Sequence, residues 1–340
     1  MDFSEDPVIE AVRDTVHRVY EAEIAPKIAA YEASGDFPYE IIRAMGDAGL
    51  FGAAFPEEMG GTAMGFAAVG TIAEEISRLS PGFGYAMNMQ AMTCPFTILN
   101  WGTEEQAKHF VPELISGRKI GMFALTEPGG GSDPGGAMRT VAKRDGDSYV
   151  LNGSKIWITF SNAADVGVLF AKTDPDAGKR GISAFIVEPK KTPGFTARPI
   201  EMRPLSNCLR SCEVFLEDFR VPAENLLGKE GEGLKVALNA LEYGRLTVSG
   251  RLIGLAQACF DETLRYARER EVGGQKIGAY QMVQQPIADV AVGIDAARLM
   301  MRRMAWLMDQ GERSTRAAAR AKYLASEVAQ KAAQTARDTF

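Results

Sequence analysis

The clearest chemical signal in this sequence is the run from Ala124 to Gly136, in which hydroxyl and acidic side chains stand on a glycine-rich turn. The turn directly follows the apolar stretch 120–125, so we expect a strand to deliver it. Because glycine accepts positive φ and has no Cβ, the backbone amides of such a turn can approach a ligand closely. The run therefore favours a place where a planar ligand lies against bare backbone.

The same turn does not match the usual phosphate-binding loops. No Gly-Lys-Ser or Gly-Lys-Thr follows it, and Pro134 occupies the third glycine position of a Gly-x-Gly-x-x-Gly frame that begins at Gly129. Glu127 and Asp133 would also repel a pyrophosphate held nearby. Taken alone, an isolated glycine-rich loop is more often an ordinary surface turn.

Segments along the whole chain resemble the acyl-CoA dehydrogenase family. The run from Ala124 to Gly136 matches the flavin-binding signature of the family position by position, and Trp157-Ile158-Thr159 matches a second motif downstream. Further matches occur in order along the sequence, at Phe55–Gly61, Val221–Gly228, Leu241–Arg245 and Tyr266–Arg270. Several ordered matches are more specific than any single motif. The resemblance implies an FAD-dependent oxidoreductase that dehydrogenates an acyl-CoA thioester.

The resemblance also implies which side chains meet the flavin. Thr126 and the backbone around Leu125 would face the N1/O2 edge, and Phe123 would close one side of the ring system. Trp157, with Ile158 beside it, would pack against the isoalloxazine, and Thr159 would bond N5. Ser132 would lie near the pyrophosphate and the substrate. Without the signature in front of it, Trp157 is more often a tryptophan of a β-barrel core.

The resemblance implies two further contacts to the cofactor, each made to the FAD of a neighbouring subunit. Arg270 would bind the pyrophosphate of that FAD, and Gln281 would make a second contact. They favour FAD over FMN, and they imply a homotetramer built from dimers. The family usually has a bulky aromatic residue three positions after this arginine, where this chain has Gly273-Gly274, so one wall of the adenine site is expected to differ. The alternative is that Arg268 and Arg270 form a solvated helix end that the helix dipole favours.

The residues that match the family's contacts to the CoA thioester are Glu242 and Arg245. They are three positions apart and so lie on one helix face, and the resemblance implies that Arg245 pairs with the nucleotide part of CoA. The alternative interpretation is that Glu242 and Arg245 form a salt bridge on the protein surface. No Lys or Arg occurs between 81 and 107, which favours an uncharged acyl group of short, branched or cyclic shape. We expect the acyl tail to run along Phe83, Tyr85, Met87, Met89, Met92 and Phe96. Without the resemblance, these residues would indicate ordinary core packing.

The residue that removes the α-proton is not identified. In most relatives the carboxylate lies near the C-terminus, and in a minority it lies where this chain has Gly244; the printed sequence ends at Phe340, before the usual position. The 340-residue chain is therefore expected to bind flavin poorly and to lack dehydrogenase activity, with Glu242 the nearest carboxylate but a CoA contact rather than the base. An oxidase, monooxygenase or enoyl-CoA reductase of the same fold, or a non-catalytic acyl-CoA-binding relative, remains an alternative.

Composition bounds the remaining possibilities. The net charge of −6, with acids and bases interleaved, argues against nucleic acid as a partner, and no apolar run is long enough to span a bilayer. No signal peptide is visible, so a cytoplasmic protein is expected, with an electron-transfer flavoprotein as the acceptor that the resemblance suggests. Cys208 and Cys212 are close enough for a metal or a disulfide, but only two histidines accompany them, so no metal is expected and unreactive thiols are favoured.

The elements that would position these residues are predicted from periodicity. We expect helices to begin at Asp6-Pro7, with apolar residues at helical spacing, and at the capping box of Thr103 and Gln106, where Pro112 should bend or interrupt the helix. Asn152-Gly153 indicates a β-hairpin. Further helices are expected at 71–79, 234–270, 281–309 and 315–340, and strands at 120–126, 150–151, 156–159, 166–171, 182–187 and 214–216.

The fold class that follows is α+β. The order of helices, short strands and helices predicts a helical domain at 1–119, a small β-barrel or sandwich domain at 120–228 and a helical domain at 229–340. The same order is that of the acyl-CoA dehydrogenase fold, in which the last domain is a helical bundle that continues beyond the last residue printed here.

Overall fold

The computed structural model describes residues 6–201 and 206–340, which fall into two compact units. Unit 1 contains the chain up to residue 22 together with 64–84 and 244–340, and unit 2 contains 23–63 and 85–243. The domain boundaries at 119 and 228 remain predictions.

Unit 1 is helical; its first helix begins where the sequence predicts, whereas the helix expected at 71–79 begins earlier, at Phe66. Helix α1 (Pro7–Val19) has the carboxylate of Asp6 at its N-cap, where it accepts a hydrogen bond of 2.9 Å from the backbone N–H of Val8. The expected start at Asp6-Pro7 is thus confirmed, and Val12 and Val16 are buried. The other long helices of this unit are α4 (Phe66–Leu79), the part of α9 (Gly233–Glu269) from residue 244 on, α10 (Gln281–Asp309) and α11 (Thr315–Thr339).

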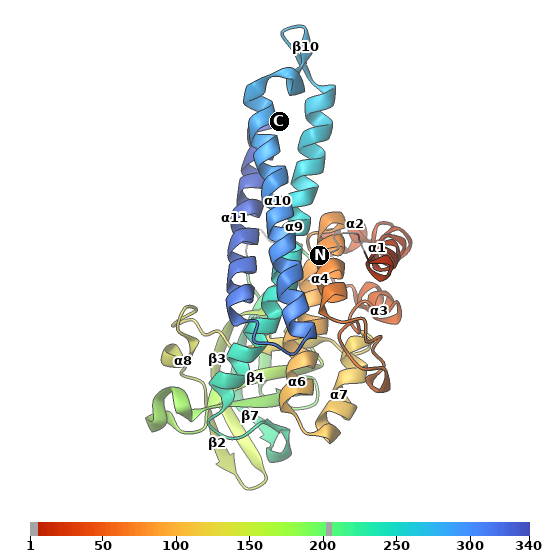
Figure 1. Ribbon diagram of the computed structural model, residues 1–340. Coiled ribbons are helices and arrows are strands. Elements are labelled where there is room, and N and C mark those ends of the chain that lie inside the picture. Colours follow the sequence, from red (N-terminus) through yellow and green to blue (C-terminus); the bar gives the residue numbers. More distant parts are fainter. Residues whose placement is uncertain (1–5, 202–205) are drawn as a thin grey trace. The chain divides into compact units, whose positions relative to one another are not determined.

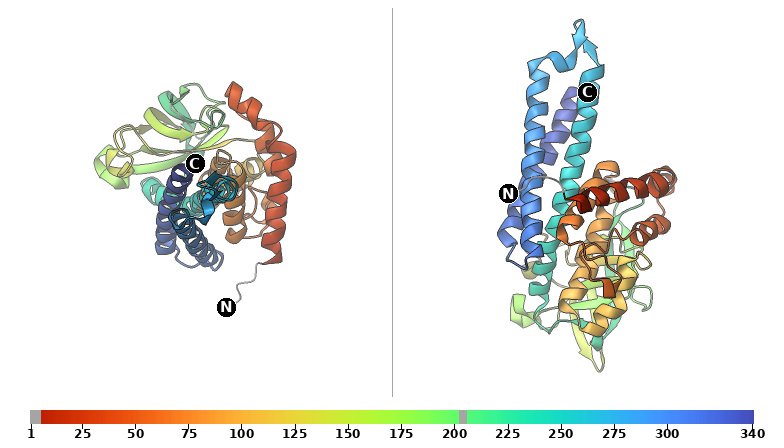
Figure 2. Two further views of the ribbon diagram at one scale, coloured as in Figure 1. Left: turned by 90° about the horizontal axis from the view of Figure 1, so that it is seen from above. Right: turned by 45° about the vertical axis from the view of Figure 1, so that its right-hand side comes forward.

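Helices α10 and α11 lie side by side as long neighbours in Figures 1 and 2. The face of α11 that packs inward carries small residues, and alanine has the highest helix propensity while filling little space. The buried alanines of α11 are Ala317, Ala318, Ala321, Ala325, Ala329, Ala332 and Ala336. A hairpin of β9 (Glu271–Val272) and β10 (Gln275–Lys276) joins α9 to α10.

Two glycines let α9 approach α4 to backbone contact. A Cβ at Gly254 would lie 2.0 Å from the carbonyl oxygen of Glu74, and one at Gly250 would lie 2.6 Å from the carbonyl oxygen of Gly70. Neither contact tolerates a methyl group, because the obstructing atoms are backbone. Close packing of this helix pair therefore depends on two particular positions of α9.

Unit 2 combines helices with a sheet. Its helix α7 (Glu104–Ile115) starts at the predicted capping box, in which Thr103 and Gln106 satisfy each other's backbone N–H groups. Pro112 lies inside this helix, which continues to Ile115, so the proline does not interrupt the helix, and the expected bend stays a prediction. The other helices are α2 (Ile28–Ser34), α3 (Tyr39–Asp47), α6 (Thr97–Trp101) and α8 (Pro134–Ala137), with α5 (Gly84–Met87) at the boundary between the units.

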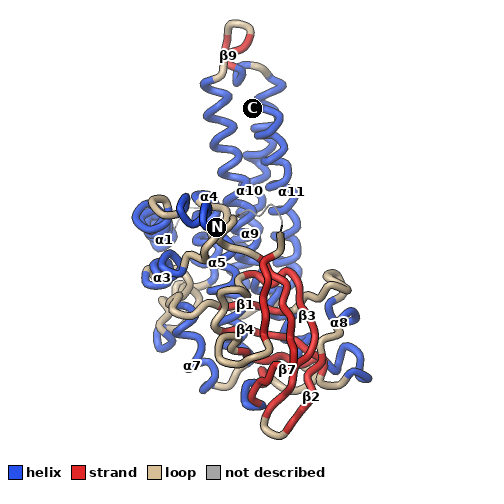
Figure 3. Tube along the Cα trace, turned by 180° about the vertical axis from the view of Figure 1, so that it is seen from behind, coloured by secondary structure: helices blue, strands red, loops and turns tan. Residues whose placement is uncertain are grey.

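The described strands of unit 2 form one eight-stranded sheet, drawn in red in Figure 3. The strand order is β6-β7-β3-β2-β4-β5-β8, and β1 pairs with β4 in parallel. The strands are β1 (Gly121–Ala124), β2 (Val141–Asp145), β3 (Ser148–Thr159), β4 (Val166–Lys172), β5 (Ile182–Val187), β6 (Phe195–Pro199), β7 (Ser211–Pro222) and β8 (Leu226–Leu227). Its apolar core includes Tyr149, Leu151 and Phe185, so a small β domain is present as expected.

The hairpin predicted at Asn152-Gly153 is wrong. These residues lie inside β3, where Leu151 pairs with Phe219 and Gly153 with Leu216, so they stand opposite a β-bulge in β7. Asn152 forms two hydrogen bonds with Asp218 on the opposite strand. The Nδ2 of Asn152 donates to the Oδ1 of Asp218 at 3.0 Å, and the backbone N–H of Asp218 donates to the Oδ1 of Asn152 at 2.9 Å. The hairpin that joins β2 to β3 turns instead at Gly146, which has φ of 61°.

Candidate functional site

The glycine-rich run folds back onto β3 and places two of the predicted residues there. The backbone N–H of Ile156 donates to the carbonyl of Thr126 at 2.9 Å. One residue earlier on each segment, the Nζ of Lys155 donates to the carbonyl of Leu125 at 3.3 Å. The structure therefore brings the Leu125-Thr126 segment against the strand that carries the tryptophan motif.

Trp157 is the most unusual residue of this strand. The pairing of β3 with β7 is interrupted between Lys155 and Ile158, and within this bulge Trp157 has φ of +63°, a left-handed conformation that bulky residues seldom adopt. Its side chain is 53% exposed. The alternative of a barrel-core tryptophan is thus excluded, and a large apolar ring is presented outward by a strained backbone, a feature that clusters at ligand sites.

The other motif residues on the sheet divide between surface and core. Thr159 is half-buried, and its Oγ1 lies 3.1 Å from the Oγ of Ser211 on β7. Ile158 is buried at 1% exposure and belongs to the sheet core. Phe123 on β1 is half-buried and packs edge-on against Phe170 with ring centroids 5.1 Å apart. Hydroxyl and ring are thus partly accessible at positions held by β structure.

The acidic residues of the run do not stand unpaired beside a ligand. Asp133 caps α8 by accepting from the backbone N–H of Gly136 at 3.1 Å and pairs with Lys179 at 2.9 Å. Glu127 is only 5% exposed and points into the protein. Ser132 is exposed, and a Cβ at Gly131 would meet nothing within 4 Å. The expected repulsion of a pyrophosphate is therefore reduced, because protein cations offset both carboxylates.

Glu127 forms a buried ion pair with Lys155, whose Nζ lies 2.8 Å from Oε1. Burial lowers the pKa of Lys155 to about 8, although Glu127 acts in the opposite direction. For Glu127, burial raises the pKa, but the charge of Lys155 and hydrogen bonds from Lys155 and residues 139–140 outweigh it, so the net pKa is lowered. Both groups are therefore charged at pH 7 beneath the glycine-rich run.

The described residues of unit 2 fit a bound flavin. The outward Trp157 ring offers an apolar wall, Thr126 and Thr159 offer partly accessible hydroxyls, and the open backbone at Gly131 offers amides without side chains in front of them. A flavin requires such a wall, hydrogen bonds along its polar edges and amide contacts for its phosphates. These features come from two segments that backbone hydrogen bonding holds together.

Arg270 and Gln281 belong to unit 1, on either side of the β9–β10 hairpin. Both are exposed. Gly273 and Gly274 form the hairpin turn, with φ of 64° and 84°, which explains why an aromatic residue is absent there: two consecutive positive φ values favour glycine. Arg270 lies just beyond α9, where the helix dipole also favours a positive charge.

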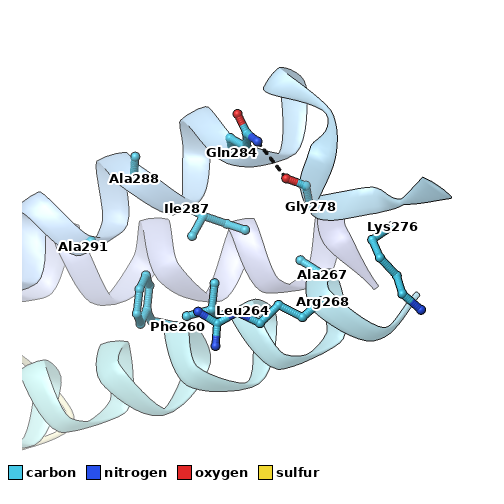
Figure 4. Close-up of a pocket in the computed structure, with 10 residues that line it drawn as sticks. All are labelled: Phe260, Leu264, Ala267, Arg268, Lys276, Gly278, Gln284, Ile287, Ala288 and Ala291. Atoms are coloured by element: carbon cyan, nitrogen blue, oxygen red, sulfur yellow. Dashed lines mark hydrogen bonds between the residues drawn. The ribbon is translucent and has the colours of Figure 1, made fainter. Parts of the chain in front are cut away.

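Next to this hairpin, α9 and α10 enclose an apolar groove of about 440 Å³, shown in Figure 4. Its floor is aliphatic and aromatic. The side chain of Arg268 extends along it toward Leu264 and Phe260, and Lys276 lies at the hairpin end. Gln284 donates from Nε2 to the carbonyl of Gly278 at 2.8 Å and fixes the start of α10. The apolar lining residues are Phe260, Leu264, Ala267, Ile287, Ala288 and Ala291.

Glu242, Gly244 and Arg245 follow one another on α9, as the helical spacing predicts. Glu242 and Arg245 are half-buried and Gly244 is buried. Residue 242 belongs to unit 2 and residues 244 and 245 belong to unit 1. The side chains predicted along an acyl tail are mostly buried around a π-helical segment, Asn88–Phe96, where Phe96 packs against Phe55 and Tyr243.

The four cysteines are buried or half-buried. Burial raises the pKa of Cys94 to about 12 and that of Cys208 to about 11. Cys212 is buried as well, and Cys259 is half-buried, each with a raised pKa caused mainly by burial. Within 6–201 and 206–340, no group of three or more metal-ligating side chains occurs, and no helix there is long and apolar enough to cross a membrane.

The thiols provide a simple test of this packing. We expect native protein at pH 8 to react slowly with a thiol reagent, with Cys259 first, because a raised pKa leaves little thiolate and burial blocks access. After denaturation all four cysteines should react. Rapid modification of two or more thiols in the native protein would contradict the burial of Cys94, Cys208 and Cys212.

Sequence reasoning missed Lys155 as a functional residue. It lies two positions before Trp157 and 28 positions from Glu127, so no local motif joins the ion pair. A signal for this pair was present in the alternation of the strand. Lys155 lies four positions after Leu151 and so faces the same side of β3, where both side chains are buried, and a lysine is seldom buried without a partner.

Comparisons with known proteins agree with this arrangement. Three family models match, the N-terminal, middle and C-terminal domains of acyl-CoA dehydrogenase, over residues 7–118, 122–219 and 231–340. A glutaryl-CoA dehydrogenase of Desulfococcus multivorans is 39% identical over 99% of this chain and 87% of the relative. The structure of butyryl-CoA dehydrogenase from Megasphaera elsdenii superimposes with a TM-score of 0.94, at 33% identity over 100% of this chain and 89% of that one.

A further solved structure, a glutaryl-CoA dehydrogenase from Mycobacterium smegmatis in complex with FADH2, has a TM-score of 0.90 and 29% identity, over 98% of this chain and 84% of its own. Family models thus cover most of the sequence, and relatives above 30% identity align with nearly all of it. The chain belongs to the acyl-CoA dehydrogenase family of FAD-dependent oxidoreductases.

Proposed function

We propose that this protein is an acyl-CoA dehydrogenase that oxidises an uncharged acyl-CoA thioester to the trans-2-enoyl-CoA with FAD. The observation that carries the proposal is the outward Trp157 ring, next in sequence to Ile156, whose N–H bonds the backbone of Thr126, in a chain of this family. A strained, exposed tryptophan has no structural benefit of its own, so a ligand that covers it accounts for its conformation.

Each predicted residue has a role in this proposal. The backbone at Leu125 and the hydroxyl of Thr126 bind the pyrimidine edge, Phe123 closes one side, and Thr159 donates near N5. Ile158 supports the wall from the core, where it is buried. Ser132 binds near the pyrophosphate on the exposed turn.

Arg270 and Gln281 complete the cofactor site from a second copy of the chain. Their exposure supports this role, because a residue that serves a neighbouring subunit must be accessible on its own. The protein would accordingly work as a homotetramer. An electron-transfer flavoprotein is the proposed acceptor, and the cytoplasm is the proposed location.

For the chemistry, FAD supplies a hydride acceptor for the β-carbon of the thioester. The chain must therefore hold the thioester with its β-carbon toward that acceptor, polarise the thioester oxygen and remove the α-proton. Glu242 and Arg245 contact CoA, with the guanidinium directed to its phosphates. Glu242 is not proposed as the base, because helical geometry turns it roughly 200° from position 244.

The acyl group is proposed to be uncharged. The segment from Tyr85 to Phe96 that would line its tail has no cationic side chain, and most of it is buried and apolar. A distal carboxylate buried there without a partner would lose its hydration and gain nothing in return. The relatives include enzymes named for glutaryl and for butyryl thioesters, so the family alone leaves this open.

The experiment has two parts. Extraction of the flavin from the natural protein should return FAD, whereas FMN or no flavin from that protein in its folded form would refute the cofactor site. A panel of thioesters should then give butyryl- or isobutyryl-CoA a kcat/KM at least about 100-fold above that of glutaryl-CoA, the equivalent of one unpaired carboxylate. A preference for glutaryl-CoA would overturn the substrate class.

A further inference from the structure

We propose that the buried ion pair of Lys155 and Glu127 is a positioning device that fixes the flavin-binding segment against the tryptophan bulge. Lys155 and Glu127 are positioning residues in this inference, since they act through Leu125 and Trp157. The inference rests on the proposed function, because it concerns the site at which FAD is proposed to bind.

The geometry of Lys155 supports this role. Its side chain is fully buried, and its ammonium group bonds both the carboxylate of Glu127 at 2.8 Å and the carbonyl of Leu125 at 3.3 Å. The carbonyl belongs to the segment proposed to meet the pyrimidine edge. A single cation on β3 thus binds both that segment and the carboxylate of Glu127.

Glu127 extends the same connection to the far end of the run. Its Oε2 accepts from the backbone N–H of Arg139 at 2.6 Å, and its Oε1 accepts from the backbone N–H of Thr140 at 3.1 Å. The carboxylate therefore joins the two ends of the loop that contains the glycines and Ser132. Without it, the amide donors at 139 and 140 would lose their partner inside the protein.

The pair also lies next to the strained residue. Lys155 is the last paired residue of β3 before the bulge, and Ile156, which follows it, donates to the carbonyl of Thr126 at 2.9 Å. These two contacts hold the backbone on one side of Trp157, while the pairing of Ile158 with Cys212 holds the other side. A positive φ at a bulky residue persists only when its surroundings determine it in this way.

Stability alone gives a weak reason for such a pair. Burying two opposite charges is seldom more favourable than packing apolar groups of the same volume. An apolar pair, however, could not bond the carbonyl of Leu125 or the two amides that Glu127 binds. What the charges add is a fixed direction for each partner, which a preorganised cofactor site needs.

The test uses Lys155→Met, Glu127→Gln and the double variant, with Lys190→Met as control. Lys190 also forms a 2.8 Å ion pair in unit 2, with Asp165, but its side chain is 49% exposed. The readouts are the FAD dissociation constant of the apoprotein, the visible spectrum of bound FAD and the unfolding midpoint. Affinities are measured well below that midpoint, so that every variant compared is folded.

We expect Lys155→Met to weaken FAD binding by about tenfold or more and to alter the flavin spectrum, since displacement of a binding group by a fraction of an ångström has effects of this order. Lys190→Met should bind as the unaltered protein does. The double variant should regain stability, because no unpaired charge remains, but it should not regain affinity, because the carbonyl of Leu125 still lacks its donor.

If the double variant recovers both stability and FAD affinity, or if folded Lys155→Met binds FAD within twofold of the unaltered protein, the pair is structural and the inference is wrong. Should Lys155→Met not fold, Glu127→Gln decides: weaker binding supports the inference, and unchanged affinity with an unchanged spectrum overturns it. Failure of the unaltered protein to bind FAD would instead refute the proposed function, which the variants presuppose.

Discussion

Replacing Gly254 with alanine is expected to lower the free energy of unfolding by about 3 kcal/mol, because the added Cβ overpacks a helix pair that is already in contact. It would lie 2.0 Å from the carbonyl oxygen of Glu74 and 2.9 Å from the backbone nitrogen of Arg78. Neither atom can move without shifting α4. Chemical denaturation followed by circular dichroism measures the loss.

Gly70→Ala is the matched control, since it lies in the partner helix of the same pair. A Cβ there meets only side-chain atoms of Leu246 and Met301, the nearest at 3.4 Å. Alanine also favours the helix by about 1 kcal/mol relative to glycine. We expect this variant to be at least as stable as the unaltered protein, and equal losses in the two variants would contradict the close approach at Gly254.

Replacing Trp157 with glycine is expected to change stability and cofactor affinity in opposite directions. Glycine adopts a φ of +63° without strain, so the apoprotein should gain about 1 kcal/mol in stability, and no cavity forms because the ring is 53% exposed. The dissociation constant for FAD should rise by about tenfold or more, since the apolar wall of the site is lost. Calorimetry and a fluorescence titration with FAD measure the two quantities.

Trp157→Ala separates the ring from the strain. Alanine removes the same wall but keeps a Cβ at a positive φ, so the loss of FAD affinity should be similar and the gain in stability should be absent. If Trp157→Gly bound FAD as tightly as the unaltered protein, the ring would not belong to the cofactor site. If it lowered stability instead, the strain argument would be wrong.

The sequence was sufficient where one short-range pattern determines an element. The long helices α10 and α11 begin and end within a residue of the predicted ranges, because their apolar periodicity is continuous. The start of α1 and the capping box of α7 were also correct, since each depends on side chains that contact backbone within three residues.

Predictions failed where pairing across the sheet decides the outcome. Asn152-Gly153 has the composition of a hairpin turn, yet it continues β3 opposite a bulge in β7, because the partner strand supplies Asp218 to bond Asn152. Strands β2 and β6 were not predicted, since most of their residues are exposed or half-buried and their apolar alternation is weak. Local propensity yields to tertiary contacts in such segments.

The candidate site shows the same division. The residues of both motifs could be named from the family pattern, and the structure places Thr126 beside the strand of Trp157. The positive φ of Trp157 and its outward ring could not be predicted, because they arise from a register shift between two strands. The partnership of Lys155 and Glu127 could not be predicted either, since only the folded sheet brings them together.

The most direct test of the account is an anaerobic titration of the natural, FAD-loaded protein with butyryl-CoA, followed by visible absorption. We expect the flavin band to bleach as the thioester is added, with enoyl-CoA formed in equal amount, and we expect glutaryl-CoA at the same concentrations to bleach it far less. Protein that carries FAD but keeps its full absorption with every neutral acyl-CoA tested would contradict the proposed dehydrogenase activity.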